Sequence, residues 1–146
     1  MMRLFVTLAL AISVTFPARA EVKITEVVSP GGITAWLVQE PSIPFMALEL
    51  RFRGGASLDA PGKRGAINLM TGLLEEGAAD LDARGFARAQ ESLAASFGYD
   101  IGNDALSVSA RFLTENRDEA VELLRKSVIE PTFAPTALER VREQVL

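Results

Sequence analysis

Apolar and polar side chains alternate along two stretches of this chain, residues 45–53 and 105–113. The apolar rows are Met46, Leu48, Leu50 and Phe52 in the first stretch and Leu106, Val108, Ala110 and Phe112 in the second. The opposite rows carry Glu49, Arg51 and Arg53, and Ser107, Ser109 and Arg111. A period of two residues is typical of a strand with one buried face. The pattern therefore predicts two strands of a half-buried antiparallel sheet.

Two further strands are predicted near the start of the chain, at about 22–28 and 32–39. The residues that join them, 29–32, read Ser-Pro-Gly-Gly. Proline and glycine favour a tight connection, so we expect these strands to form a hairpin.

Helical spacing predicts one helix over residues 64–76 and a second that runs from Asp82 to about Phe97. Asp82 is suited to the N-cap, where its carboxylate can accept a hydrogen bond from a free backbone N–H. Phe86, Leu93 and Phe97 then lie close to one apolar stripe.

Two more helices are expected in the last third of the chain. One opens at residues 114–116, and Glu122 and Lys126 form an exposed i,i+4 pair on it. Its inward residues are predicted to be Ala120, Val121, Leu124 and Val128. The last helix has Pro135 near its first turn and an apolar row made of Leu138, Val141 and Val145.

These elements predict the fold class. Strands and helices are grouped without strict βαβ alternation, which favours an α+β fold with helices packed on one face of a mainly antiparallel sheet. We expect residues 21–146 to form one domain and to be part of a longer one, since the chain stops inside a helical pattern without a helix-ending signal.

Residues 1–20 read as a signal peptide, with a basic start, an apolar run and an Ala-x-Ala cleavage site before Glu21. The apolar run is too short for a membrane span. Cleavage leaves 13 Lys and Arg against 19 Asp and Glu, a net charge of −6, which argues against nucleic acid as a partner. Cysteine is absent, so neither disulfides nor a lipoprotein anchor can form. We expect secretion across the inner membrane into the periplasm of a Gram-negative bacterium.

Several segments follow one another in an informative order. The strand at 45–53 leads to Gly54-Gly55-Ala56-Ser57, a Pro-Gly turn at 61–62, the helix at 64–76 and a glycine at its end. Further on, Glu130-Pro131-Thr132-Phe133 precedes the last helix. Over roughly residues 22–146 this order resembles the amino-terminal domain of the insulinase-like family (M16, pitrilysin and mitochondrial processing peptidase).

That family carries a zinc-binding HxxEH motif on the first helix. An i,i+4 pair of histidines holds the metal, and the glutamate acts as base on the bound water. The matching positions here read Asn68, Thr71 and Gly72, and the chain contains no histidine. The matching position of the third ligand falls beyond Leu146, and Val141 occupies that of the acidic residue that supports it. The resemblance therefore implies no catalytic residues and no metal in this chain.

Silent subunits of this family imply a partner. By resemblance, we expect a non-catalytic subunit that helps enclose a peptide, together with an active M16-type zinc peptidase that alone carries the zinc. Residues 98–110 match the region that presents an edge strand to peptides, and edge pairing gives affinity through main-chain hydrogen bonds. Asn103, Asp104 and Ala105 are the peptide-binding candidates in that region.

Two alternatives stay open. The first is an M16-type metalloendopeptidase whose metal is held by carboxylates, with Glu75, Glu76 and Asp80 as the nearby acids. Oxygen ligands suit Mg²⁺ or Ca²⁺ better than catalytic Zn²⁺, and neighbouring Glu75 and Glu76 point about 100° apart on a helix. The second is a structural envelope protein without a peptidase partner.

Overall fold

The structure is a computed structural model that describes residues 22–145, in two compact units. The first unit contains residues 22–42 and the second residues 43–145. The predicted signal peptide lies outside the described residues. Within the described part of the chain, no helix combines the length and the apolar character that a membrane crossing requires.

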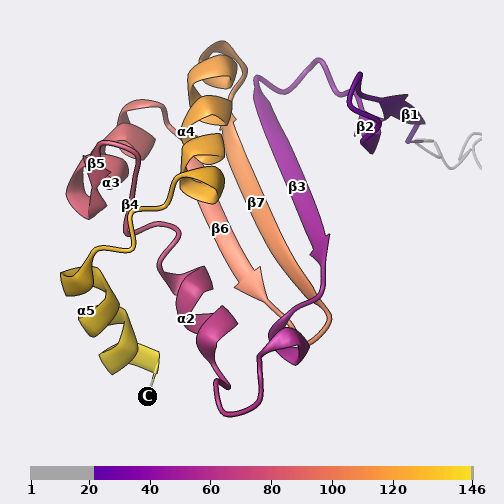
Figure 1. Cartoon of the computed structure of the whole chain (residues 1–146). Helices are drawn as coiled ribbons and strands as arrows, with labels where there is room; N and C mark the ends of the chain where they lie inside the picture. The colour runs from indigo at the N-terminus through magenta and orange to yellow at the C-terminus, as the bar shows by residue number, and fades with distance from the viewer. Residues whose placement is uncertain (1–21, 146) are drawn as a thin grey trace, which may run out of the picture. The chain divides into compact units, whose positions relative to one another are not determined.

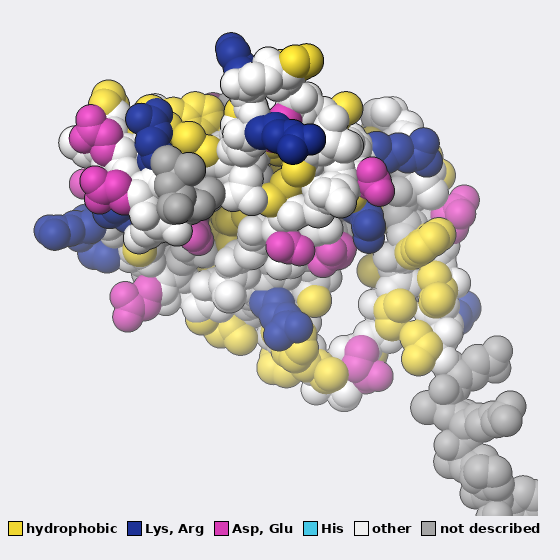
Figure 2. Space-filling model, turned by 90° about the horizontal axis from the view of Figure 1, so that it is seen from below, with side chains coloured by type: hydrophobic (Ala, Val, Ile, Leu, Met, Phe, Trp, Pro, Cys, Tyr) yellow, Lys and Arg dark blue, Asp and Glu magenta, His cyan; other side chains and the backbone are white. Residues whose placement is uncertain are grey.

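The first unit is a β-hairpin. Strand β1 (Ile24–Val28) pairs antiparallel with β2 (Thr34–Val38), which confirms the predicted hairpin. Ser29 closes the turn, because its hydroxyl accepts from Ile33 N (3.0 Å) while its N–H donates to the Ile33 carbonyl (2.8 Å). All ten strand residues are exposed, and apolar side chains cover part of the surface (Figure 2). A two-stranded hairpin is marginally stable alone.

The second unit is built around a three-stranded antiparallel sheet of order β3-β7-β6 (Figure 1). Strands β3 (Phe45–Arg53) and β7 (Ala105–Leu113) have the predicted boundaries, and Leu50 pairs with Val108. Strand β7 is central because β6 (Ser96–Ile101) pairs with its other side. Helices pack on one face of the sheet, so the predicted α+β class is confirmed.

Strand β6 corrects the predicted helix 82–97. Helix α3 (Ala83–Ser92) begins as expected, because the Asp82 carboxylate accepts from Gly85 N at 2.7 Å. It ends well before Phe97, where Ala94 adopts a left-handed conformation with φ of 48° and the chain turns back. Phe86 and Phe97 still meet, with ring centroids 6.2 Å apart. The contact expected along one helix is thus a tertiary contact between a helix and a strand.

The predicted helix 64–76 is also shorter in the structure. Helix α2 (Ala66–Gly72) follows a short 3₁₀ turn, η2 (Ala56–Leu58). Asp59 holds its start, since one carboxylate accepts from Gly65 N (2.6 Å) and Ile67 N (3.0 Å). After turns at 73–76, β4 (Gly77–Ala78) and β5 (Leu81–Asp82) form a small hairpin that the sequence analysis did not predict. Gly77 has φ of 130°, which only glycine adopts readily.

Helix α4 (Arg117–Ile129) covers the sheet and is preceded by the 3₁₀ turn η3 (Thr114–Asn116). Ala120 and Leu124 pack on Val108, Ala110 and Phe112 to form the main core. Two details of the prediction are wrong. Val121 is 41% exposed, and Leu123 is buried instead. Glu122 binds Arg125 at 2.8 Å, one turn away, rather than pairing with Lys126.

Helix α5 (Pro135–Val145) begins at Pro135, as predicted, because proline lacks the N–H that the first helical position leaves free. Ala137 and Val141 are buried against Leu73 of the segment after α2, and Leu138 is half-buried beside them. This apolar contact joins α5 to α2.

A buried hydroxyl pair joins β6 to α4. The Tyr99 hydroxyl lies 2.5 Å from Ser127 Oγ, and Ser127 donates to the Leu124 carbonyl at 2.8 Å. Because the serine proton is used for that carbonyl, Tyr99 is the donor in the pair. Burial raises the pKa of Tyr99 to about 12.

We expect Tyr99 to titrate near pH 12 in the folded protein, against about 10 for an exposed tyrosine. Its contribution to stability is complete below pH ~10 and is lost as the pH rises through 12, since the unfolded chain releases the proton first. Phenolate absorbance reports this group alone, because the chain contains one tyrosine. Tyr99→Phe should remove both the absorbance change and this part of the pH dependence. A native midpoint near pH 10 would contradict the buried pair.

Candidate functional site

Helix α2 carries Asn68, Thr71 and Gly72, the three positions that the family resemblance matches to HxxEH. Asn68 is exposed, whereas Thr71 is only 4% exposed. The Thr71 hydroxyl donates to the Ile67 carbonyl at 2.8 Å, so its polar group is satisfied within the helix. Asn68 and Thr71 therefore present no ligand pair for a metal.

Gly72, the third position, lies against α5. A Cβ atom on Gly72 would be only 3.0 Å from Val141 Cγ1, which is closer than ordinary van der Waals contact. Val141 is itself 4% exposed and belongs to the apolar cluster with Leu73 and Ala137. Apolar packing fills the place where a ligand side chain would stand, so these residues do not fit a zinc ion.

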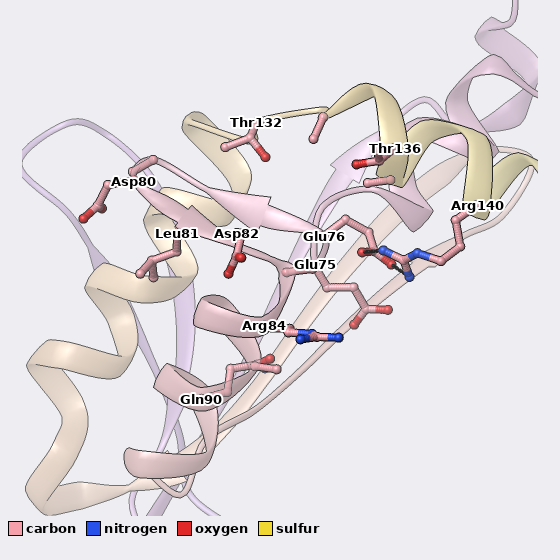
Figure 3. Close-up of a pocket in the computed structure, with 15 residues that line it drawn as sticks. Glu75, Glu76, Asp80, Leu81, Asp82, Arg84, Gln90, Thr132, Thr136 and Arg140 are labelled. Carbon is pink, nitrogen blue, oxygen red and sulfur yellow. Dashed lines mark hydrogen bonds and ion pairs between the residues drawn. The ribbon is translucent and has the colours of Figure 1, made fainter.

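An ion pair adds to the contact between α5 and the segment after α2. Arg140 donates to Glu76 through both terminal nitrogens, one of them at 2.9 Å from Oε1 (Figure 3). Hydrogen bonding to Glu76 raises the pKa of Arg140. The Glu76 side chain is mostly covered, and its carboxylate is already occupied by Arg140.

The same residues border a cavity of about 930 Å³, which the β4–β5 hairpin, α3 and α5 complete. Figure 3 shows Arg84 and Glu75 extending toward the same space, whereas Asp80 lies at the opposite end. Among the residues that the structure describes, no three His, Cys, Asp or Glu side chains are grouped to hold a metal ion. Glu75, Glu76 and Asp80 therefore do not form the carboxylate site that the first alternative requires.

The candidates Asn103, Asp104 and Ala105 lie where β6 turns into β7. Asn103 and Asp104 are exposed, and Ala105 is the first residue of β7. The carbonyls of Asn103 and Asp104 accept from Ser57 (3.0 Å) and Gly54 (2.8 Å). These main-chain acceptors are used inside the fold, and a role of the three residues in peptide binding stays a prediction.

The edge of β6 lies partly within residues 98–110, where the family resemblance led us to expect an edge strand, but a strand over residues 96–101 was not predicted. This strand pairs with β7 on one side, and no backbone hydrogen bond occupies its other side within residues 22–145. A signal was present in the sequence, since Phe97, Tyr99 and Ile101 alternate with Ser96, Gly98 and Asp100. An open strand edge can accept another strand through main-chain hydrogen bonds.

Comparison with known proteins places this geometry in context. The sequence model of the insulinase family, Peptidase family M16, matches residues 34–146. Among curated proteins, the non-peptidase homolog YmxG of Helicobacter pylori is 36% identical over 104 residues, which cover 71% of this chain and 24% of that protein. The chain thus spans about a quarter of that relative.

Solved structures agree. A peptidase M16 inactive domain from Pseudomonas fluorescens superposes with a TM-score of 0.79 at 29% identity, over 86% of this chain and 31% of that one. Pitrilysin gives a TM-score of 0.72 at 16% identity, over 88% of this chain and 14% of its own. A protease from Helicobacter pylori gives 0.71 at 15% identity, over 86% and 30%. The last two likenesses concern the fold alone.

Restoring the motif should destabilise this chain. The combined substitutions Asn68→His, Thr71→Glu and Gly72→His would overpack the contact with Val141 and bury a carboxylate without a partner, at a cost of about 2–5 kcal/mol in the free energy of unfolding. Urea unfolding measures the loss. Asn68→His alone is the control, since an exposed position should change stability by less than about 0.5 kcal/mol. A triple variant as stable as the natural chain would show that Val141 does not constrain Gly72.

Proposed function

Because this chain belongs to the insulinase family of M16 peptidases, we propose that it acts as a non-catalytic subunit that contributes to a peptide-binding chamber with an active, zinc-bearing partner. The observation that carries the proposal is the packing of Gly72 against Val141. Together with the exposed Asn68 and the internally bonded Thr71, it leaves no group at these three positions that could hold a metal or activate water.

The relatives support the same reading. The proteins at 36% and 29% identity are described as a non-peptidase homolog and an inactive domain. The fold is nevertheless that of pitrilysin. A fold that persists while the chemistry of its site is absent favours binding as the retained function.

Chemistry in the complex would come from the partner. We propose an M16-type zinc peptidase with an intact HxxEH motif, joined to this chain as a heterodimer in the periplasm. The signal-peptide pattern of residues 1–20 supports export. A pre-formed chamber wall would raise the partner's activity by holding the peptide in an extended form, since ordering the substrate beforehand lowers the entropic cost of reaction.

Peptide would bind at the open edge of β6. Ser96–Ile101 is long enough for several ladder hydrogen bonds, and these read the main chain rather than a particular sequence. Strand β7 holds β6 in place along all six residues. The neighbouring turn at Asn103 is braced by Gly55, where a Cβ atom would be 2.1 Å from the Gly102 carbonyl. Strand β6 is therefore paired along its whole length on the β7 side before peptide arrives.

A reconstitution experiment tests the partnership. The purified full-length protein should neither cleave peptides nor hold stoichiometric zinc alone, and it should raise cleavage when mixed with an HxxEH peptidase from the same organism. The same mixture made with a partner whose motif glutamate is changed to glutamine is the control, and it should be inactive. Cleavage and metal in this protein alone would overturn the proposal. Absence of any effect on every such peptidase would instead favour a structural envelope protein.

Backbone methylation of the peptide tests the edge. In an antiparallel ladder only alternate residues of the peptide donate N–H groups to β6. Methylation of one alternate set of nitrogens should therefore weaken binding severalfold for each bond lost, at about 1 kcal/mol per hydrogen bond. Methylation of the other set should have a much smaller effect. Equal effects of the two sets, measured by fluorescence anisotropy of labelled peptide, would exclude strand addition.

A further inference from the structure

We propose that Arg111 and Asp100 give the β6 edge a charge order, so that it prefers peptides in which a basic residue comes four positions before an acidic one. This inference rests on the proposed binding of peptide at that edge. It adds the class of peptide that the edge selects.

The open face of the sheet supplies the geometry. Helix α4 covers the face that contains Val108, Ala110 and Phe112, and the opposite face carries no helix from the described residues of this unit. On β6 this open face presents Ser96, Gly98 and Asp100. Arg111 of β7 is paired directly with Ser96. At the Ser96 end of β6, the Arg111 guanidinium therefore lies on the neighbouring strand β7. At the other end, the Asp100 carboxylate lies on β6 itself.

A hollow on the open face, lined by residues of β3, β7 and β6, leaves room for the Arg111 side chain. It has a volume of about 430 Å³, and Ser96, Gly98, Ser109 and Arg111 line it. A Cβ atom on Gly98 would lie 2.8 Å from Ser109 Oγ, so glycine keeps the hollow open. A strand added to β6 would be two strand spacings from β7, about 10 Å. The long side chains of arginine and glutamate can together bridge that span across Ser96.

Both charges are free to meet a ligand. Arg111 and Asp100 are exposed, and neither belongs to an ion pair within the described part of the chain. Glu49 also lines the hollow, but it is paired with Ser109 and lies beyond ion-pair distance of Arg111. Asp100 would be the direct cross-strand neighbour of a bound residue, where opposite charges attract and like charges repel.

The direction of the bound peptide determines whether its basic or its acidic residue comes first in the peptide sequence. The sheet is antiparallel throughout, and we take the added strand to continue that pattern. A peptide antiparallel to β6 meets Asp100 before it meets Ser96 and Arg111. Residues directly opposite in an antiparallel pair share a face, so the side chains facing Asp100 and Ser96 are four positions apart. The favoured sequence is thus Lys-x-x-x-Glu, and Glu-x-x-x-Lys is disfavoured.

Two capped peptides of the same composition test the inference, one with Lys-x-x-x-Glu and one with the reverse order. Fluorescence anisotropy with the full-length protein should show about threefold to tenfold tighter binding of the first peptide. Its two charged residues meet opposite charges at Asp100 and Arg111, whereas those of the reverse peptide meet like charges. Added salt should reduce the difference. The double variant Arg111→Glu with Asp100→Lys should reverse the preference.

Arg53→Glu is the matched control, because Arg53 is an exposed arginine on the same face but on β3, opposite Ala105. This variant should keep the natural preference. Equal binding of both peptides, unchanged in the double variant, would overturn the charge order while leaving peptide binding at β6 intact. If neither peptide binds, alone or with the zinc peptidase partner, both the charge order and the proposed function fail.

Discussion

The pairing of β7 with both β3 and β6, under the cover of α4, is the constraint on which the second unit depends. Helix α4 buries Val108, Ala110 and Phe112 beneath Ala120 and Leu124, and this burial determines which face of the sheet is excluded from solvent. Because side chains alternate along a strand, the same burial leaves the serines and Arg111 of β7 on the open face. The Tyr99–Ser127 pair then fastens β6 to α4. The open edge and the open face are therefore direct consequences of how the core packs.

A second contact determines what the chain cannot do. By the family resemblance, the metal of an active relative connects the motif helix to the last helix, which brings the third ligand. Here Val141 packs on Gly72, and Arg140 binds Glu76, so an apolar contact and an ion pair join the same region. Both contacts involve α5, and neither needs a metal. The contact between α5 and the segment around α2 is thus made by apolar packing and by an ion pair between side chains of this chain.

The likeness to pitrilysin shows that the backbone alone does not distinguish a peptidase from a silent relative. In this chain, Asn68, Thr71 and Gly72 of α2 supply neither an imidazole nor a carboxylate, and Val141 of α5 packs on Gly72. An edge strand, by contrast, needs only main-chain groups to bind another strand. A strand edge that binds through main-chain groups does not depend on the side chains of a metal site.

The sequence was sufficient to predict the α+β class, the limits of β3 and β7, the hairpin and the cap at Asp82. Each of these follows from local periodicity, turn chemistry or residue identity. Packing between distant segments was needed to show that α3 ends before Phe97, that α2 stops at Gly72, and that Leu123 rather than Val121 is buried. The spacing of Phe86 and Phe97 is compatible both with one long helix and with a helix followed by a strand that turns back. Gly72 and Val141, which pack together, are separated by nearly seventy residues of chain. Local patterns cannot separate such cases, because the deciding contacts form only when distant segments pack together.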